Sequence, residues 1–130
     1  MTNFIHSVVA FNQKVLGIDQ RQPCALSEQE LEISLKCLQE ELDEFKYAAY
    51  DHDYIGQIDA IVDLLYFGIG VLYKLGLTPA QIEQVCSAVH EANMAKKLGT
   101  NAKRDTGAAD AVKPEGWIAP EARIAKIVLG

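Results

Sequence analysis

The sequence has few cysteines and less positive than negative charge. Its 3 Cys residues, Cys24, Cys37 and Cys86, have the spacing of neither a disulfide framework nor a CxxC zinc site. Buried thiols in a reducing, cytoplasmic compartment are the simplest interpretation. Lys and Arg number 12 against 18 Asp and Glu, for a net charge of −6. Because nucleic-acid polymers are bound by basic faces, this balance argues against such a partner; an anionic small molecule stays possible if a cation neutralises its site.

No secretion signal is expected at this N-terminus. The N-terminus, MTNFIHSVVAF, has no basic segment and no small-residue cleavage site. The apolar stretch from Ile58 to Leu77 is about as long as a bilayer-spanning helix. It contains Asp59, Asp63 and Lys74. These charges favour a buried helix of a soluble protein, and no membrane partner is expected.

Strand-like alternation and internal repeats are absent. With 130 residues, 49% of them hydrophobic, the chain is long enough for one globular core. Apolar residues recur at helical spacing in four segments, which predicts an all-α fold. We expect a single domain over 1–130, with a four-helix bundle at about 2–99 and an irregular extension at about 100–130 that ends in a short helix from about Glu121.

Capping residues mark the expected helix starts. Ser27 with Glu30 and Thr78 with Gln81 have capping-box spacing, and Asp53 is placed to cap the third helix. The glycines expected to end the first, third and fourth helices are Gly17, Gly76 and Gly99. The predicted core faces are Phe4, Val8, Phe11 and Val15 on the first helix, Leu31, Leu35, Leu38, Leu42 and Phe45 on the second, and Ile82, Val85, Val89 and Ala92 on the fourth.

The third helix, expected from Tyr54 to Leu75, is apolar almost all round. Such a helix is buried in a core or between subunits. One four-helix chain does not easily cover it on all sides, so we expect a homo-oligomer, either a dimer or a tetramer.

Acidic residues interrupt the second and third helices. Glu40, Glu41 and Glu44 lie within one turn, and Asp59 and Asp63 are i,i+4 neighbours on an otherwise apolar helix. Buried, unpaired carboxylates need a cation, a hydrogen-bond network or a changed protonation state. In an antiparallel pair the helices would present Glu41, Glu44, Asp59 and Asp63 to one another, and an all-oxygen set selects Mg²⁺ or Mn²⁺. The alternatives are an ordinary acidic surface for the glutamates and a structural, hydrogen-bonded aspartate pair.

These stretches, EELDEF, DAIVDLLYFGIGVLYKLG and EANMAKKLG, resemble the all-α nucleotide pyrophosphohydrolase superfamily, and most closely its small stand-alone MazG-like members. The late KPEGWIAP is part of the same likeness. The family signature is ExxE followed by ExxD on the next helix. Glu41, Glu44 and Asp63 match it, whereas the Glu of ExxD falls at Ala60. Asp59, one residue earlier, is the nearest carboxylate and takes that role on this interpretation.

The resemblance implies a Mg²⁺-dependent enzyme, with Mn²⁺ as a possible substitute. It would cleave the α–β phosphoanhydride of a nucleoside triphosphate or related nucleotide and release a monophosphate and pyrophosphate. The expected role of this reaction is to remove unwanted nucleotides from the nucleotide pool. Glu41, Glu44, Asp59 and Asp63 would bind the metal, and a water held by the ion or by a carboxylate would attack. Glu40 is a candidate to position or activate that water, so the predicted catalytic set is Glu40, Glu41, Glu44 and Asp63.

Candidate substrate ligands follow on the fourth helix. Asn93 lies at i,i+3 and i,i+4 spacing from Lys96 and Lys97, and in the resembling proteins such an Asn and Lys face the nucleotide. Lysines in a last helical turn also complement the helix dipole without any ligand. Trp117 is expected to anchor the tail, with stacking on a base as the alternative.

Two other functions are compatible with the sequence. A non-catalytic helical oligomerisation module would use the third helix as an interface and keep the carboxylates on the surface. A redox-iron carboxylate bundle is disfavoured, because such bundles use Glu-x-x-His pairs and the sequence contains none.

Overall fold

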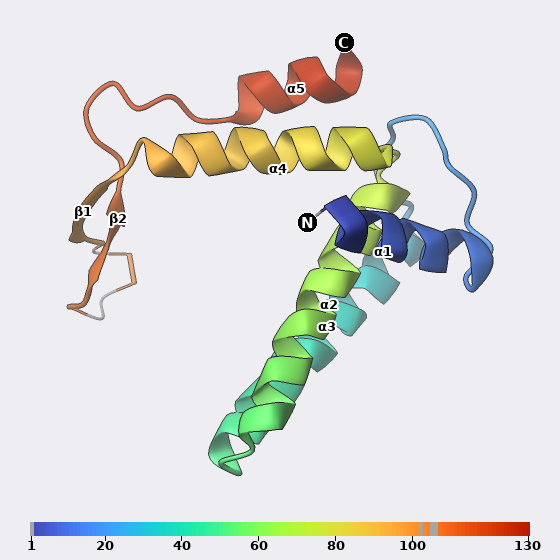
Figure 1. The fold of residues 1–130 in the computed structure, drawn as a ribbon, viewed down its shortest axis with the longest axis horizontal. Coiled ribbons are helices and arrows are strands. Elements are labelled where there is room, and N and C mark those ends of the chain that lie inside the picture. The colour runs from blue at the N-terminus through green and yellow to red at the C-terminus, as the bar shows by residue number, and fades with distance from the viewer. Residues whose placement is uncertain (1, 102, 105–106) are drawn as a thin grey trace. The chain divides into compact units, whose positions relative to one another are not determined.

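A computed structural model describes residues 2–101, 103–104 and 107–130, which form two compact units, Met1–Ile82 and Glu83–Gly130 (Figure 1). The first unit contains α1 (Thr2–Lys14), α2 (Glu28–Tyr50), α3 (Tyr54–Lys74) and the start of α4 (Pro79–Met94). The second contains the rest of α4, β1 (Lys97–Thr100), β2 (Ala109–Val112) and α5 (Glu121–Leu129). Helices make up most of the chain, which confirms the all-α class.

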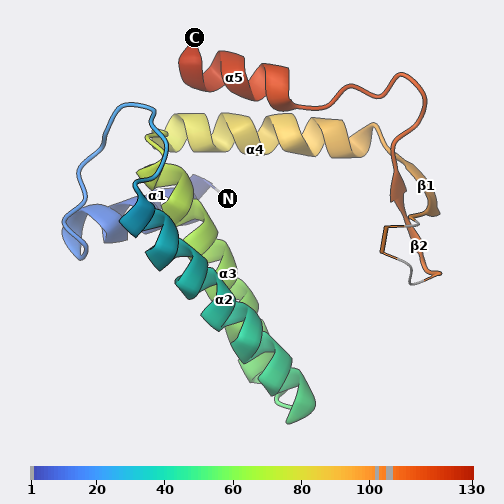
Figure 2. The same cartoon turned by 180° about the vertical axis from the view of Figure 1, so that it is seen from behind.

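The predicted antiparallel packing of the two acidic helices is present. α2 and α3 run side by side in opposite directions in both views (Figures 1 and 2). The turn between them is short: His52 adopts a positive φ of 57°, and the Asp53 carboxylate accepts a 2.9 Å hydrogen bond from the Gly56 amide. Asp53 is therefore the N-cap of α3, as its position predicted.

The face that α2 buries differs from the predicted one. The leucine stripe is largely exposed, with Leu31 at 48%, Leu35 at 57% and Leu42 at 47% of their full accessibility. The buried residues of α2 are Ser34 and Glu41. They lie roughly a quarter of a helical turn away from the stripe. The prediction of a leucine core on this helix is wrong for the single chain, because α2 rests on α3 through its small and acidic side.

Aromatic contacts join α1 to α3. Phe4 and Phe11 each meet the Tyr66 ring edge-on, at centroid distances of 5.8 and 5.5 Å. Val8 of the predicted stripe is fully buried. Val15 is 68% exposed because the helix ends at Lys14, so its assignment to the core was wrong. Val89 on α4 is likewise exposed.

The starts of α2 and α4 are capped by the hydrogen bonds that the sequence predicted. The Ser27 hydroxyl accepts from the Glu30 amide, and the Glu30 carboxylate accepts from the Ser27 amide. The Glu30 carboxylate also accepts hydrogen bonds from both terminal guanidinium nitrogens of Arg21. The Arg21 pair, followed by the Ser27 hydrogen bonds, lowers the pKa of Glu30 to about 2. Thr78 and Gln81 make the corresponding capping box of α4.

The segment between α1 and α2 is tied to the end of α3. The buried Tyr73 hydroxyl donates to the Ile18 carbonyl at 2.8 Å, and the Cys24 amide donates to the Leu75 carbonyl at 3.0 Å. Gly76 has a φ of 94°, and a Cβ there would lie 2.2 Å from the Gln22 carbonyl oxygen. Only glycine fits this turn, both for its conformation and for the space.

The second unit departs from the predicted irregular extension. Lys97–Thr100 pairs antiparallel with Ala109–Val112, and α4 ends at Met94 rather than near Gly99. Each strand has only four residues, too few to display an alternating pattern. The expected terminal helix from Glu121 is confirmed.

The three cysteines are unpaired, as predicted. Cys24 and Cys86 are exposed and Cys37 is half-buried, so the expectation that all three are buried was wrong. Exposed thiols are compatible with reducing conditions.

By length and composition, α3 is the one helix among the described residues that is apolar enough to cross a membrane. Core helices of soluble proteins meet the same criterion. Only Ala60, Ile69, Gly70 and Tyr73 of α3 are buried, which leaves much of its apolar surface exposed in the single chain.

Candidate active site

Three carboxylates meet between α2 and α3. Glu41, Glu44 and Asp63 each offer an oxygen within 4.8 Å of the other two. The i,i+3 spacing puts the two glutamates on one side of α2, and the antiparallel hairpin brings Asp63 opposite them. Glu41 is buried, Asp63 is half-buried and Glu44 is exposed, so the cluster leads from the helix interface to solvent.

The cluster has no neutralising partner in the described part of the chain. None of its three carboxylates is in an ion pair there, and one oxygen of Glu41, Oε2, is buried without a hydrogen bond. Burial, followed by the nearby Glu44, Asp63 and Asp59, raises the pKa of Glu41 to about 7. Burial, followed by the charges of Asp59 and Glu44, also raises the pKa of Asp63.

A hard divalent cation fits this arrangement. All donors are carboxylate oxygens, the preferred ligands of Mg²⁺ and Mn²⁺. Oxygens on opposite sides of one Mg²⁺ lie about 4.2 Å apart, twice the metal–oxygen distance. The 4.8 Å limit on the distances between the three carboxylate oxygens is compatible with their sharing one ion. The unpartnered oxygen of Glu41 is the kind of group that a cation satisfies.

Two further acidic residues of the predicted site lie outside this group of three. Asp59 is exposed, one turn before Asp63, and it is near enough for its charge to raise the pKa values of Glu41 and Asp63. Ala60, at the position of the motif Glu, is 1% exposed. Glu40 is exposed, next to the buried Glu41 in the chain. Metal binding by Asp59 and water activation by Glu40 stay predictions.

The predicted substrate ligands belong to the second unit and do not share a helical face. Asn93 is on α4, Lys96 follows the helix and Lys97 is the first residue of β1. The Lys96 amide donates to the Asn93 carbonyl at 3.1 Å, which turns the chain after the helix. The prediction that Asn93, Lys96 and Lys97 share the fourth helix was therefore wrong for both lysines, because α4 ends at Met94. Contact of the three residues with substrate stays a prediction.

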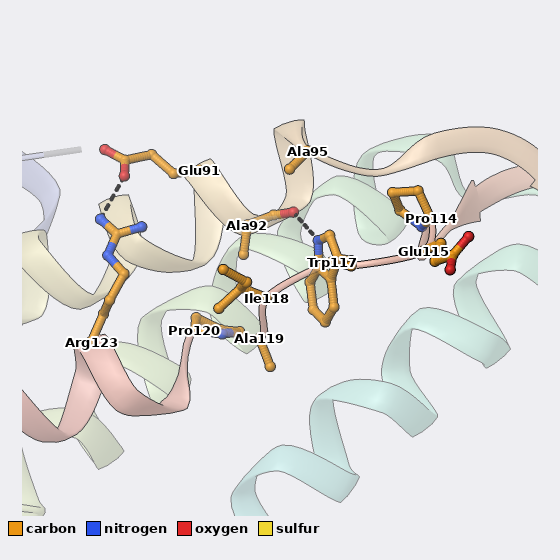
Figure 3. A pocket seen from close by; sticks show the side chains of 11 residues that line it. Glu91, Ala92, Ala95, Pro114, Glu115, Trp117, Ile118, Ala119, Pro120 and Arg123 are labelled. Carbon is orange, nitrogen blue, oxygen red and sulfur yellow. Dashed lines mark hydrogen bonds and ion pairs between the residues drawn. The ribbon is translucent and has the colours of Figure 1, made fainter.

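Trp117 anchors the tail to α4, as expected. Its indole nitrogen donates to the Ala92 carbonyl at 2.7 Å, and Arg123 pairs with Glu91 one position earlier (Figure 3). The ammonium groups of Lys96 and Lys113 lie 5.3 and 5.0 Å from the Trp117 ring centroid. The ring is therefore engaged by two lysines and a backbone hydrogen bond.

Sequence reasoning assigned no role to Asn12 and Ser34. Both are buried, at 2% and 5% exposure, and each has a side-chain oxygen without a hydrogen-bond partner. Leaving such an atom unpaired costs about 1–3 kcal/mol. The sequence could have indicated both residues: Asn12 is a polar residue at the apolar spacing of α1, and Ser34 is a polar residue next to the leucine stripe of α2.

The hairpin, with ExxE on one helix against an aspartate on the next, defines an all-α nucleotide pyrophosphohydrolase. The sequence model of the phosphoribosyl-ATP pyrophosphohydrolase family matches residues 10–93, more than half of the chain and all three clustered carboxylates. The chain belongs to this family, within the MazG-like all-α superfamily. The protein is thus a hydrolase of acid anhydrides in nucleotide-like substrates. Comparison with curated proteins gives no match.

Proposed function

We propose that the protein is a Mg²⁺-dependent nucleoside triphosphate pyrophosphohydrolase that cleaves the α–β phosphoanhydride and releases a nucleoside monophosphate and pyrophosphate. The observation that carries this proposal is the cluster of Glu41, Glu44 and Asp63, with its unpartnered buried oxygen. A triphosphate does not approach three carboxylates unless a cation intervenes, since both are anionic. Mn²⁺ has the same ligand preference and is expected to substitute.

The chain's own groups have distinct tasks in this reaction. Glu41, Glu44 and Asp63 would hold the ion, with Asp59 completing the set. An ion bound there would neutralise charge on the phosphate oxygens of the substrate. The oxygen of a water forms a bond to the α-phosphorus, the bond from that phosphorus to the α–β bridging oxygen breaks, and the water's protons pass to solvent or base. Glu40 is proposed to position that water by accepting a hydrogen bond from it.

The direct test is a panel of common, oxidised and deaminated nucleoside triphosphates, with products separated by chromatography. At least one substrate is expected to yield pyrophosphate and a monophosphate with Mg²⁺ or Mn²⁺, and chelation is expected to stop the reaction. Orthophosphate as the first product would refute α–β cleavage. No turnover across the whole panel with either metal would favour the non-catalytic oligomerisation module.

We also propose that the protein is a homo-oligomer. The exposed stripe of α2 includes Leu35 at 57% and Leu42 at 47%, and α3 exposes Ile58 at 46% and Leu65 at 49%. Large apolar side chains are thus exposed on two helices that pack side by side, which is typical of a surface that another protein chain covers. A second copy of the chain, packing by two-fold symmetry, is the proposed cover, either in a dimer or in a tetramer made of two such dimers.

Substituting Leu35→Glu and Leu42→Glu together is expected to convert the oligomer to monomer, because two charges one heptad apart would be buried at the interface. Light scattering coupled to gel filtration measures the mass. Val15→Glu, at an exposed apolar residue just after α1, is the matched control and is expected to leave the assembly intact. A monomeric unsubstituted protein would contradict the proposal.

We place the enzyme in the cytoplasm, as a single catalytic domain over residues 1–130 without a nucleic-acid or membrane partner. The three unpaired cysteines and the net charge of −6 support this placement.

A further inference from the structure

Two lysines lie together at the open end of the β1–β2 hairpin. The end pair of the ladder is Lys97 with Val112, so Lys96 and Lys113 are the residues just before β1 and just after β2. Antiparallel pairing brings these two positions side by side, although a whole hairpin separates them in the sequence. Because two ammonium groups repel each other, a third group is needed to hold them close together.

The ring of Trp117 is that third group. The Lys96 ammonium lies 5.3 Å from the centroid of the ring, and the Lys113 ammonium lies 5.0 Å from it. Both distances are in the range in which the electron-rich face of an indole attracts a cation. The two ammonium groups are therefore close to one another as well as to the ring, and the attraction of the ring offsets their repulsion.

Hydrogen bonds fix the Trp117 ring in place. Its indole nitrogen donates to the Ala92 carbonyl of α4 at 2.7 Å (Figure 3). The Trp117 amide donates to the Pro114 carbonyl at 3.1 Å, which closes a tight turn. Gly116 takes a positive φ of 76° within this turn, a conformation that favours glycine. The chain after β2 thus folds back onto α4, and the ring is positioned without any ligand.

Neither Lys96 nor Lys113 is in an ion pair in the part of the chain that the structure describes. Lys96 does act on Asp110. The hydrogen bond from the Ala111 amide lowers the pKa of Asp110 most, and the Lys96 charge contributes least. Asp110 itself is in an ion pair with Arg104. The three N–H donors of each lysine are therefore available to a ligand.

A ligand with two adjacent phosphates fits this pair of lysines. An ammonium group that lies over an aromatic ring can still donate its N–H groups to phosphate oxygens on the side away from the ring. Such hydrogen bonds are charge-assisted and therefore stronger than those between neutral groups. One phosphate for each lysine corresponds to two phosphates joined by a bridging oxygen. In a chain with a net charge of −6, two neighbouring cations without an ion-pair partner distinguish this place for an anion.

We propose that Lys96 and Lys113 bind the two phosphates of a diphosphate group, and that Trp117 is a positioning residue that holds both ammonium groups in place for it. The diphosphate group belongs either to the substrate or to free pyrophosphate. The part of this inference that concerns the substrate rests on the proposed function. Trp117 acts through the two lysines and does not touch the reacting atoms.

The chain contains 1 Trp, so tryptophan fluorescence reports on this ring alone. Titrating inorganic pyrophosphate into the protein in the presence of a chelator is expected to change the emission of Trp117 saturably, because the ammonium groups shift when phosphates bind. Lys96→Gln and Lys113→Gln are each expected to weaken pyrophosphate binding by about 10-fold or more, the effect of losing a charge-assisted hydrogen bond. Lys126→Gln, at an exposed lysine of α5, is the matched control and should bind pyrophosphate normally.

A positioning role predicts that Trp117 matters only while the lysines are present. Trp117→Leu is expected to weaken pyrophosphate binding by about 5-fold, measured by calorimetry because the fluorophore is lost. Trp117→Phe keeps an aromatic face and is expected to restore part of the affinity. In a Lys113→Gln background, Trp117→Leu is expected to cause a clearly smaller loss, since one of the two groups that it positions is gone. A merely structural anchor would give the same loss in both backgrounds.

The proposal is overturned if pyrophosphate gives neither an emission change nor binding heat, if sulfate at the same ionic strength gives an equal response, or if Lys126→Gln loses as much affinity as Lys113→Gln. With a triphosphate and Mg²⁺, a higher KM in Lys113→Gln assigns the site to the substrate. An unchanged KM with weaker inhibition by pyrophosphate assigns it to free pyrophosphate. Pyrophosphate binding without turnover of any triphosphate keeps this site and rejects the proposed reaction, whereas turnover without pyrophosphate binding does the reverse.

Discussion

Asp63→Asn is expected to lower Mg²⁺-dependent pyrophosphate release by roughly 10²- to 10³-fold, the usual effect of removing one preorganised electrostatic contact. The same substitution is expected to raise the melting temperature of the metal-free protein. Asn has nearly the shape of Asp, so packing is kept while a charge within 4.8 Å of Glu41 and Glu44 disappears. Lost activity together with gained stability is the signature of a residue kept for binding a cation.

Steady-state turnover and thermal unfolding by circular dichroism in chelator measure the two effects. Asp43→Asn is the matched control: Asp43 is exposed on α2 and accepts a hydrogen bond from Gln39, away from the cluster. It should change neither quantity appreciably. Glu44→Ala is expected to behave like Asp63→Asn, with a normal helical spectrum. Full activity of both cluster variants would remove the proposed site.

Magnesium is expected to stabilise the protein strongly above about pH 7 and little near about pH 5. The pKa of Glu41 is raised from 4.5 to about 7, so between these values the metal-free folded chain holds a proton that the unfolded chain has released. Stability of the metal-free protein therefore falls as pH rises through this window, by at most about 3 kcal/mol. Asp63, whose pKa is also raised, acts in the same direction. Mg²⁺ competes with these protons, so it binds best when they have left.

Unfolding curves in chelator and in excess Mg²⁺, recorded across this pH range, test the prediction. Glu41→Gln is expected to flatten the pH dependence and to abolish most of the Mg²⁺ effect. Glu30 provides an internal contrast, because its pKa is lowered to about 2 by Arg21 and the Ser27 cap. Its contribution is present above about pH 4.5 and is lost only as pH falls toward 2. A Mg²⁺ effect independent of pH would contradict the proton competition.

The site was predictable to the extent that it is built from local spacing. Glu41 and Glu44 share a side of one helix, and a short turn makes the next helix antiparallel, so Asp63 was expected opposite them. The family signature added the expectation of a Glu where Ala60 stands. Whether Asp59 compensates is a question of side-chain reach, which the sequence does not answer: Asp59 is exposed and lies outside the group of three.

The cavity of about 200 Å³ that Asn12 of α1, Ser34 of α2 and Gly70 of α3 line together was not predictable in the same way. Asn12 and Ser34 lie 22 positions apart and line it together only because α1 and α2 both pack on α3. The sequence shows each as a single polar residue near an apolar stripe. That both lose their contact with water, and that neither finds a partner, follows from the packing alone.

By itself the sequence determined where the helices begin, because capping joins residues such as Ser27 and Glu30 that are three positions apart. It also determined the all-α class and the acidic motif. Only the tertiary structure decided which side of α2 is buried, that α4 stops at Met94, and that two four-residue strands pair after it. The physical reason is that these features depend on contacts with residues far away in the sequence. Such contacts set the rotation of a helix about its axis and the pairing of short strands, and they produce no periodic pattern in the local sequence.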